Sequence, residues 1–276
     1  MASEELKVKS ARFRALHDGR QPFIMPNPFD IGTAKLLVSL GYEALATTSA
    51  GFAFTRGLPD GGVPFDQRIA HAKEMAASVE VPVSADLEKG KGDSAESAGE
   101  TVFAAEAAGL AGCSVEDHTG EPAAPIYEFT HAIERVQAAV EAARAFSHDF
   151  ILTARAENML WGGTLDDTIR RLVAFEQAGA DVLFAPGLDM DGIRAVMDAV
   201  TKPINVLAGP GMRMDELAAL GVRRISVGSK LSTTAFGAVR RAAREMRDAG
   251  TFTFAEDVMG FGELQDLFAP DPLTRA

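Results

Sequence analysis

Four segments of the chain repeat one local pattern, in which a helix-like stretch reaches a glycine and is followed within a few residues by an apolar run. The glycines are Gly41, Gly109, Gly179 and Gly221, and the runs that follow them are Ala44–Ser49, Cys113–Asp117, Val182–Gly187 and Ile225–Ser229. Glycine relieves left-handed strain where a helix ends, and a strand that is buried on both faces needs no polar alternation. The pattern predicts a helix-to-strand unit that the chain uses repeatedly.

Four further apolar runs lie between these units, which brings the predicted strands to eight. They are Phe23–Pro26, Val81–Leu87, Phe150–Arg155 and Ile204–Ala208. Apolar residues three and four positions apart predict helices in the intervening stretches, Ser94–Ala108, Ala132–Ala145, Leu165–Ala178 and Leu231–Asp248. Strands that alternate with helices pair in parallel through right-handed crossovers, and eight such units close most simply as a barrel. We therefore expect an α/β fold, a (β/α)8 TIM barrel.

One barrel accounts for the whole chain as a single catalytic domain, residues 1–276, because such barrels run to about 250 residues as one unit. Residues 250–276 are expected to form a C-terminal extension with an extra helix. Phe252, Phe254 and Phe261 give this extension more apolar surface than one barrel needs. We expect it to pack on a neighbouring subunit, with packing on its own barrel as the alternative.

A doubly wound open sheet is the alternative architecture. A glycine loop that cradles a phosphate would favour it, and the Gly-x-Gly candidates are Gly90-Lys91-Gly92 and Gly209-Pro210-Gly211. Neither continues as a dinucleotide-binding fingerprint that opens a helix. The barrel is therefore preferred.

Charge and composition exclude several classes of function. A net charge of −12 argues against a nucleic-acid partner, which requires a concentrated basic surface. Met1–Arg14 lacks the apolar stretch of a secretory signal, and no apolar run approaches the about 18 residues that a membrane span needs. The single cysteine, Cys113, cannot form an internal disulfide. We expect a cytoplasmic protein that binds neither nucleic acid nor a membrane.

The predicted strand ends are unusually acidic, at the place where barrel enzymes keep their reactive groups. The third strand ends with Asp86 and Glu88, and the fourth ends with Glu116. Because alternate residues of a strand share a face, these carboxylates should point to one place. Crowded carboxylates repel each other, and a hard divalent cation relieves the conflict while keeping coordinated water. The sequence thus predicts Mg²⁺ or Mn²⁺, with helix capping or pairing to Arg155 as the alternative.

Ordered pieces of the chain resemble the isocitrate lyase and phosphoenolpyruvate mutase superfamily. The matching pieces are Asn27-Pro28-Phe29-Asp30, Thr48-Ser49-Ala50-Gly51, Gly57-Leu58-Pro59-Asp60, Asp86 with Gly90 and Gly92, Val115-Glu116-Asp117, and Ala154-Arg155 with Glu157. Together they cover nearly the whole chain, from Phe23 to about Asp248. The resemblance implies a (β/α)8 barrel whose last helix is exchanged between subunits, in a homo-oligomer that is a dimer or a tetramer.

The resemblance also implies a substrate site for a small carboxylate or phosphonate. Ser49, Ala50 and Gly51 would hold a carboxylate or enolate oxygen, partly through backbone N–H groups. Arg155 would pair with a carboxylate or phosphonate in a forked geometry. Asn205, on the seventh predicted strand, is expected to complete this site.

The metal site implied by the resemblance departs from the family pattern at one position. Asp60, Asp86 and Glu116 would hold the metal or its waters. Family members commonly place an aspartate two residues before the match to Asp86, whereas this chain has Ser84 there. Glu88 is therefore included as a compensating candidate ligand. The metal would polarise the C2 oxygen of a pyruvate-like unit and lower the cost of the enolate.

The loop after the fourth strand separates this chain from two branches of the superfamily. The lyase branch carries Lys-Lys-Cys-Gly-His there and the mutase branch a lysine, whereas Glu116–Pro125 contains neither. His118, Glu121 and Tyr127 are the proton donors available, and His118 has the pKa best suited to neutral operation. We expect His118, Glu121 and Arg155 to be the catalytic residues. The other histidines, His17, His71, His131 and His148, lie outside the predicted strand ends and are expected on the surface.

The sequence therefore predicts a magnesium-dependent lyase that cleaves a C–C or P–C bond in a small 2-oxo or 2-hydroxy carboxylate through a pyruvate-enolate-like intermediate. Decarboxylation of an oxaloacetate-like acid and hydrolysis of phosphonopyruvate both fit. Two alternatives stay open. One is a metal-dependent aldolase of the pyruvate type, and the other is a non-catalytic barrel that binds a metabolite.

Overall fold

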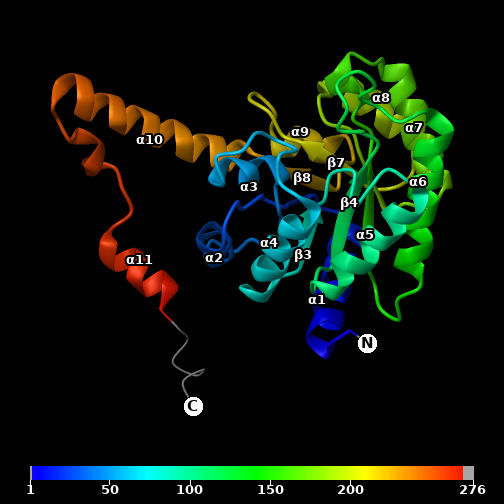
Figure 1. Ribbon diagram of the computed structural model, residues 1–276, viewed down its shortest axis with the longest axis horizontal. Coiled ribbons are helices and arrows are strands. Elements are labelled where there is room, and N and C mark those ends of the chain that lie inside the picture. Colours follow the sequence, from blue (N-terminus) through cyan, green and yellow to red (C-terminus); the bar gives the residue numbers. More distant parts are fainter. Residues whose placement is uncertain (1, 270–276) are drawn as a thin grey trace.

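A computed structural model describes residues 2–269 and has the predicted barrel architecture (Figure 1). One eight-stranded sheet has the order β1-β8-β7-β6-β5-β4-β3-β2, with parallel pairing throughout. Its strands are β1 (Phe23–Ile24), β2 (Leu45–Ala46), β3 (Val83–Asp86), β4 (Gly112–Glu116), β5 (Ile151–Arg155), β6 (Val182–Phe184), β7 (Ile204–Leu207) and β8 (Arg224–Ser226). The N–H of Ala46 donates to the carbonyl of Pro26 over 3.1 Å, which joins β2 to the end of β1. The predicted barrel is confirmed, and the open sheet is excluded.

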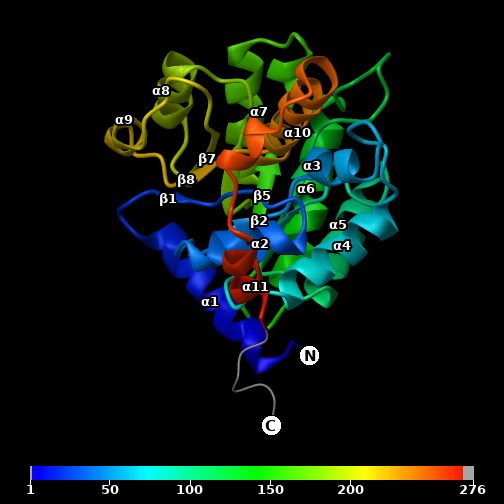
Figure 2. The same ribbon diagram turned by 90° about the vertical axis from the view of Figure 1, so that its left-hand side faces the viewer.

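Helices cover the outside of this sheet, except for the last two, which extend away from it (Figure 2). They are α1 (Glu4–Asp18), α2 (Ile31–Ser39), α3 (Ser49–Thr55), α4 (Phe65–Ala77), α5 (Ala95–Ala107), α6 (Phe129–Arg144), α7 (Leu165–Gln177), α8 (Met190–Ala199), α9 (Met214–Ala219), α10 (Lys230–Ala249) and α11 (Phe261–Phe268), with short 3-10 turns η1 (Asn158–Trp161) and η2 (Thr253–Glu256). The side chains of Thr48, Ser94, Thr164 and Asp189 each accept a backbone N–H three residues on, which fixes where α3, α5, α7 and α8 begin. None of the helices in residues 2–269 has the length and apolar character needed to cross a bilayer.

Strand alternation separates the two faces of the sheet. Cys113 is fully buried in the apolar layer between the strands and the helices, on the face opposite to its neighbour Ser114. The opposite face carries polar residues that line the barrel interior, namely Ser84, Ser114, Asn205, Arg224 and Ser226. Bulky branched side chains usually fill this space. The interior of the barrel is therefore open enough, at the carboxyl ends of the strands, to hold a small polar molecule.

His17 corrects the expectation that the remaining histidines lie on the surface. It is 3% exposed, on the last turn of α1, where its ring meets Phe13 and Phe23 edge-on. Its Nδ1 lies 2.8 Å from the carbonyl of Phe13. The side chain of His148 is buried as well. Helix α1 packs against the strands and so buries the His17 ring. The position of His17 in the sequence did not predict this burial.

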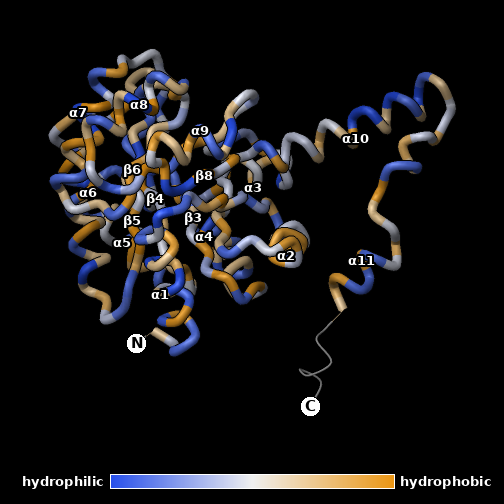
Figure 3. The backbone as a smooth tube through the Cα atoms, turned by 180° about the vertical axis from the view of Figure 1, so that it is seen from behind, coloured by the Kyte–Doolittle hydropathy of each residue, from blue (hydrophilic) through white to orange (hydrophobic). Residues whose placement is uncertain are grey.

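The C-terminal segment projects from the barrel as an arm formed by α10, η2 and α11 (Figure 1). Helix α10 contacts α3 near its start, and α11 returns to contact α2. Hydrophobic and hydrophilic residues alternate along this arm (Figure 3), and Val239 and Phe261 are 66% and 80% exposed. The last part of the predicted extension, residues 270–276, lies outside the described residues.

Candidate active site

A cavity of about 160 Å³ lies at the carboxyl ends of the strands. This volume and the polar side chains around it fit a small acid. Six of the residues predicted from the sequence line it, namely Ser49, Ala50, Asp60, Asp86, Arg155 and Asn205. The other five, Gly51, Glu88, Glu116, His118 and Glu121, are not part of its lining.

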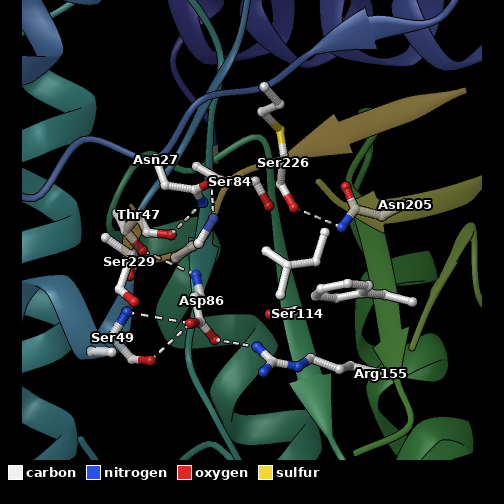
Figure 4. Close-up of a pocket in the computed structure, with 18 of the residues that line it drawn as sticks. Asn27, Thr47, Ser49, Ser84, Asp86, Ser114, Arg155, Asn205, Ser226 and Ser229 are labelled. Carbon is white, nitrogen blue, oxygen red and sulfur yellow. Dashed lines mark hydrogen bonds and ion pairs between the residues drawn. The ribbon is translucent and has the colours of Figure 1, made fainter. Parts of the chain in front are cut away.

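Asp86 is held in place by the loop that leads into α3 (Figure 4). Its Oδ2 accepts from the backbone N–H of Ser49 over 3.2 Å and from the Ser49 hydroxyl over 2.8 Å. Its own backbone N–H donates to Oγ1 of Thr47 over 3.0 Å. The strand end and the start of α3 therefore form one rigid unit.

Gly51 supports this unit from behind the cavity. It is buried, and its N–H donates to the Thr48 side chain over 3.1 Å. A Cβ at this position would come within 2.4 Å of the Thr48 side chain, so only glycine fits. That N–H is already engaged, and Ser49 and Ala50 line the cavity whereas Gly51 does not.

Arg155 stands between the carboxylates of three strand ends. It lies 3.6 Å from Oδ1 of Asp86 and 3.5 Å from Oε2 of Glu116, and it pairs closely with Glu157. Its guanidinium carbon also lies 5.0 Å from the centre of the Phe184 ring. Three acids around one guanidinium leave this part of the site with excess negative charge.

The acids fit a divalent cation that keeps much of its water. The pKa of Asp60 is raised by desolvation and then by the charge of Asp86, because both carboxylates face one space. Burial raises the pKa of Glu116 to about 7 against the opposing charge of Arg155. Among residues 2–269, no three His, Cys, Asp or Glu side chains converge as a complete protein cage for a metal. Mg²⁺ commonly takes only one or two carboxylates together with water and substrate oxygens, and Asp86 with Asp60 provides such a set.

The structure does not bring Glu88 to the cavity. The chain turns through a left-handed conformation at Glu88, with φ of 55°, so strand alternation ends at Asp86. The Glu88 carboxylate pairs closely with Arg68, whose other terminal nitrogen donates to the carbonyl of Gly90 over 3.2 Å. In this arrangement Arg68 holds the Glu88 carboxylate outside the lining of the cavity, and its part in metal binding stays a prediction.

His118 approaches the cluster from the loop after β4. Its ring stacks on Trp161 with centroids 4.7 Å apart, and its Nδ1 lies 3.7 Å from Oε1 of Glu116. This interaction with Glu116 is the main cause that raises the pKa of His118. Glu121 is exposed further along the same loop. His118 is therefore connected to Arg155 through Glu116.

Several cavity residues were missed at the sequence level. Asn27 bridges two loops, because its amide donates to the carbonyl of Thr47 and its oxygen accepts from Val227 and Gly228. Arg224 begins β8 one residue before the predicted run, since a charged side chain does not meet an apolar criterion. Ser226, two positions further along the strand, shares the inward face with Arg224, and this alternation was the signal that could have found it.

Comparison with known proteins agrees with this geometry. The family model for phosphoenolpyruvate phosphomutase matches residues 13–247. Oxaloacetate decarboxylase from Paraburkholderia xenovorans is 33% identical over 230 residues, which cover 79% of this chain and 74% of that protein. The crystal structure of a candidate lyase/mutase from Burkholderia cenocepacia is 50% identical, with a TM-score of 0.94 and coverage of 97% of this chain and 98% of that one. Phosphonopyruvate hydrolase, crystallised with oxalate and Mg²⁺, matches 94% of each chain with a TM-score of 0.83 at 24% identity, a likeness of fold.

Proposed function

The chain belongs to the phosphoenolpyruvate phosphomutase family and is an enzyme of the lyase type, and on that premise we propose that it decarboxylates a small oxaloacetate-like 2-oxo diacid. The observation that carries the proposal is the arrangement of Ser49, Asp86 and Arg155 around a cavity of about 160 Å³. The relative named oxaloacetate decarboxylase supports cleavage of a C–C bond ahead of a P–C bond.

The residues around the cavity match the needs of this reaction. Asp86, with Asp60 through water, would hold Mg²⁺ or Mn²⁺, which supplies polarisation of the substrate C2 oxygen when bound. Arg155 pairs with a substrate carboxylate, and the Phe184 ring beneath its guanidinium limits access of water. The N–H of Ala50, at the start of α3, donates toward negative charge that develops on the substrate as CO₂ leaves.

The proton that completes the product comes from the loop after β4 in this proposal. His118 is the donor, with Glu116 holding its ring and Glu121 in the same loop as a second acid. The stacking on Trp161 fixes the plane of the imidazole ring. Protonation of the enolate carbon then yields the 2-oxo monoacid.

The arm is proposed to pack on a second copy of this chain, which gives a dimer or a tetramer. A groove lined by Phe54, Leu58 and Phe236 lies between α3 and the first part of α10. Val239 and Phe261 are exposed further along the arm. Apolar surface of this extent is typical of an interface. We place the protein in the cytoplasm, where its single cysteine stays reduced.

A substrate panel tests the proposed reaction. Oxaloacetate, phosphonopyruvate and 2-hydroxy diacids are incubated with enzyme and Mg²⁺, and pyruvate, phosphate and aldehydes are quantified by NMR. Pyruvate and CO₂ from oxaloacetate should form well above the rate with Mg²⁺ alone, and Asp86→Asn should reduce the difference to near zero. Phosphate release would move the assignment to P–C cleavage, and aldehyde release would move it to a pyruvate aldolase. Oxalate binding without any turnover would leave a non-catalytic metabolite-binding barrel.

A further inference from the structure

The floor of the cavity contains a buried guanidinium whose hydrogen-bonding partners are all neutral groups. Arg224 is 3% exposed and lines the cavity from the first position of β8. Its Nε donates to Oδ1 of Asn205 and one terminal nitrogen donates to Oγ1 of Thr153, both over 2.9 Å. The other terminal nitrogen lies 3.3 Å from Nε2 of His17. Nδ1 of His17 faces the carbonyl of Phe13, so Nδ1 carries the ring proton and donates it there. Nε2 is therefore unprotonated and accepts from Arg224.

The two arginines of the cavity differ in how their charge is balanced. Arg155 has three carboxylates within ion-pair distance. Arg224 forms no ion pair with any residue in the described range 2–269, and burial lowers its pKa to about 9. A buried charge is costly unless an opposite charge meets it. Arg224 therefore keeps an uncompensated positive charge inside the barrel.

This guanidinium has capacity for another partner. Arginine offers five N–H donors, and the contacts with Asn205, Thr153 and His17 use one donor each. The amide of Asn205 in turn donates to the Ser226 hydroxyl over 2.9 Å. Figure 4 shows Asn205 and Ser226 across the pocket from Ser49. The cavity therefore has an acidic, metal-binding side and a separate cationic floor.

We propose that Arg224 is a specificity-determining residue, the cation that selects substrates with a second negatively charged group. The inference rests on the proposed function, in which Asp86 and Arg155 handle the 2-oxo acid end of the substrate. The distal carboxylate of a four-carbon diacid lies toward Arg224. This carboxylate supplies the negative charge that no protein carboxylate provides to the guanidinium. A mono-acid of the same shape leaves the guanidinium unmatched and binds less tightly.

A purely structural role for Arg224 makes a different prediction. Its hydrogen bonds also tie β8 to β5, β7 and α1, so its loss destabilises the barrel in either case. Only the specificity role links its charge to the charge of the ligand. The decisive quantity is therefore the ratio of affinities for two ligands that differ in charge and hardly in shape.

Malate and its 4-amide, malamate, are such a pair, and calorimetry with Mg²⁺ present measures both without turnover. The wild-type protein should bind malate about tenfold or more tightly than malamate, as a charge-assisted pair requires. Arg224→Gln and Asn205→Asp should each bring the ratio below about threefold. Asn205→Asp keeps the oxygen that accepts from Arg224 and adds a negative charge that compensates the guanidinium. It therefore tests the role of the Arg224 charge even if Arg224→Gln does not fold.

Two controls separate charge from packing. Thr153→Val removes a neutral hydrogen bond to Arg224 and should leave the malate-to-malamate ratio unchanged, as should any variant that merely loosens the barrel. Oxalate spans only two carbons, and its affinity should change less than about threefold in the two charge variants. A wild-type ratio near one, a ratio that survives both charge variants, or an equal loss of oxalate affinity would overturn the proposal. Failure of the proposed reaction would appear separately, as an absence of product from the substrate panel.

Discussion

Ser49 donates both its backbone N–H and its hydroxyl to the same carboxylate oxygen of Asp86, over 3.2 and 2.8 Å. The other oxygen of that carboxylate is left facing Arg155, 3.6 Å away. Two donors on one oxygen fix the rotation of the carboxylate. Ser49 is therefore a positioning residue for Asp86, a role beyond the contact with substrate that the sequence predicted for it.

Ser49→Ala tests this positioning role. The substitution removes the hydroxyl and keeps the backbone N–H, so Asp86 stays in the site with one restraint fewer. Loss of a residue that orients a metal ligand costs about 10- to 100-fold in metal affinity or activity. A Mg²⁺ titration of turnover should show the loss as a higher half-saturating concentration. Ser39→Ala, which removes an exposed hydroxyl on α2, is the matched control, and an unchanged Mg²⁺ dependence of the Ser49 variant would contradict the role.

Glu88→Gln distinguishes the ligand suggested by the sequence from the ion pair found in the structure. Because Glu88 pairs with Arg68 and does not line the cavity, the Mg²⁺ affinity should change less than about threefold, as expected for a residue that does not bind the ion. The free energy of unfolding should fall by about 1–3 kcal/mol, since Arg68 loses a charged partner in a partly buried setting. Urea denaturation and calorimetry with Mg²⁺ measure the two quantities. A tenfold loss of Mg²⁺ affinity without loss of stability would restore Glu88 as a ligand.

Alternation explains which parts of the site the sequence could predict. A strand buried on both faces must be apolar except where it meets the cavity, so the four glycine-to-strand units and the four apolar runs between them located all eight strands. Asp86 and Arg155 end such strands, and they lie in the cavity as expected. These predictions depend only on local geometry.

Glu88 and Arg224 show where local geometry stops being sufficient. The direction of Glu88 depends on a left-handed turn and on Arg68, 20 positions away in the sequence. Arg224 lies in a strand although its charge excludes it from an apolar pattern, because Asn205, Thr153 and His17 satisfy its donors. Contacts between segments distant in the sequence decide both residues.

His17 predicts a specific pH dependence of stability. Burial, followed by the charge of Arg224, lowers the pKa of His17 to about 3, whereas an unfolded histidine titrates near 6.5. The unfolded chain therefore binds one more proton between these values. The stabilising effect of the neutral ring is complete above pH 6.5 and is lost progressively as the pH falls toward 3.

Urea denaturation at several pH values from 7.5 to 4.5 measures this effect. The wild-type free energy of unfolding should fall more steeply below pH 6.5 than that of His17→Gln, by about 1.4 kcal/mol per pH unit for one proton. His131→Gln, at a less buried histidine on α6, should keep the wild-type slope. Parallel curves for wild-type protein and His17→Gln would show that His17 does not titrate between the two states.

Phe261 tests whether the arm joins two copies of the chain. It is 80% exposed on α11, and Phe236 on α10 meets Phe54 on α3 edge-on, with ring centroids 6.5 Å apart. Because α3 carries both Phe54 and Ser49, we expect an interface on the arm to help hold that helix in place. Light scattering at micromolar concentration should show an oligomer for the wild-type protein and smaller species for Phe261→Asp, with turnover falling in proportion. Gln265→Asp places the same charge on α11 and should leave the oligomer intact. If the wild-type protein is monomeric and fully active, both the proposed interface and its link to the active site are contradicted.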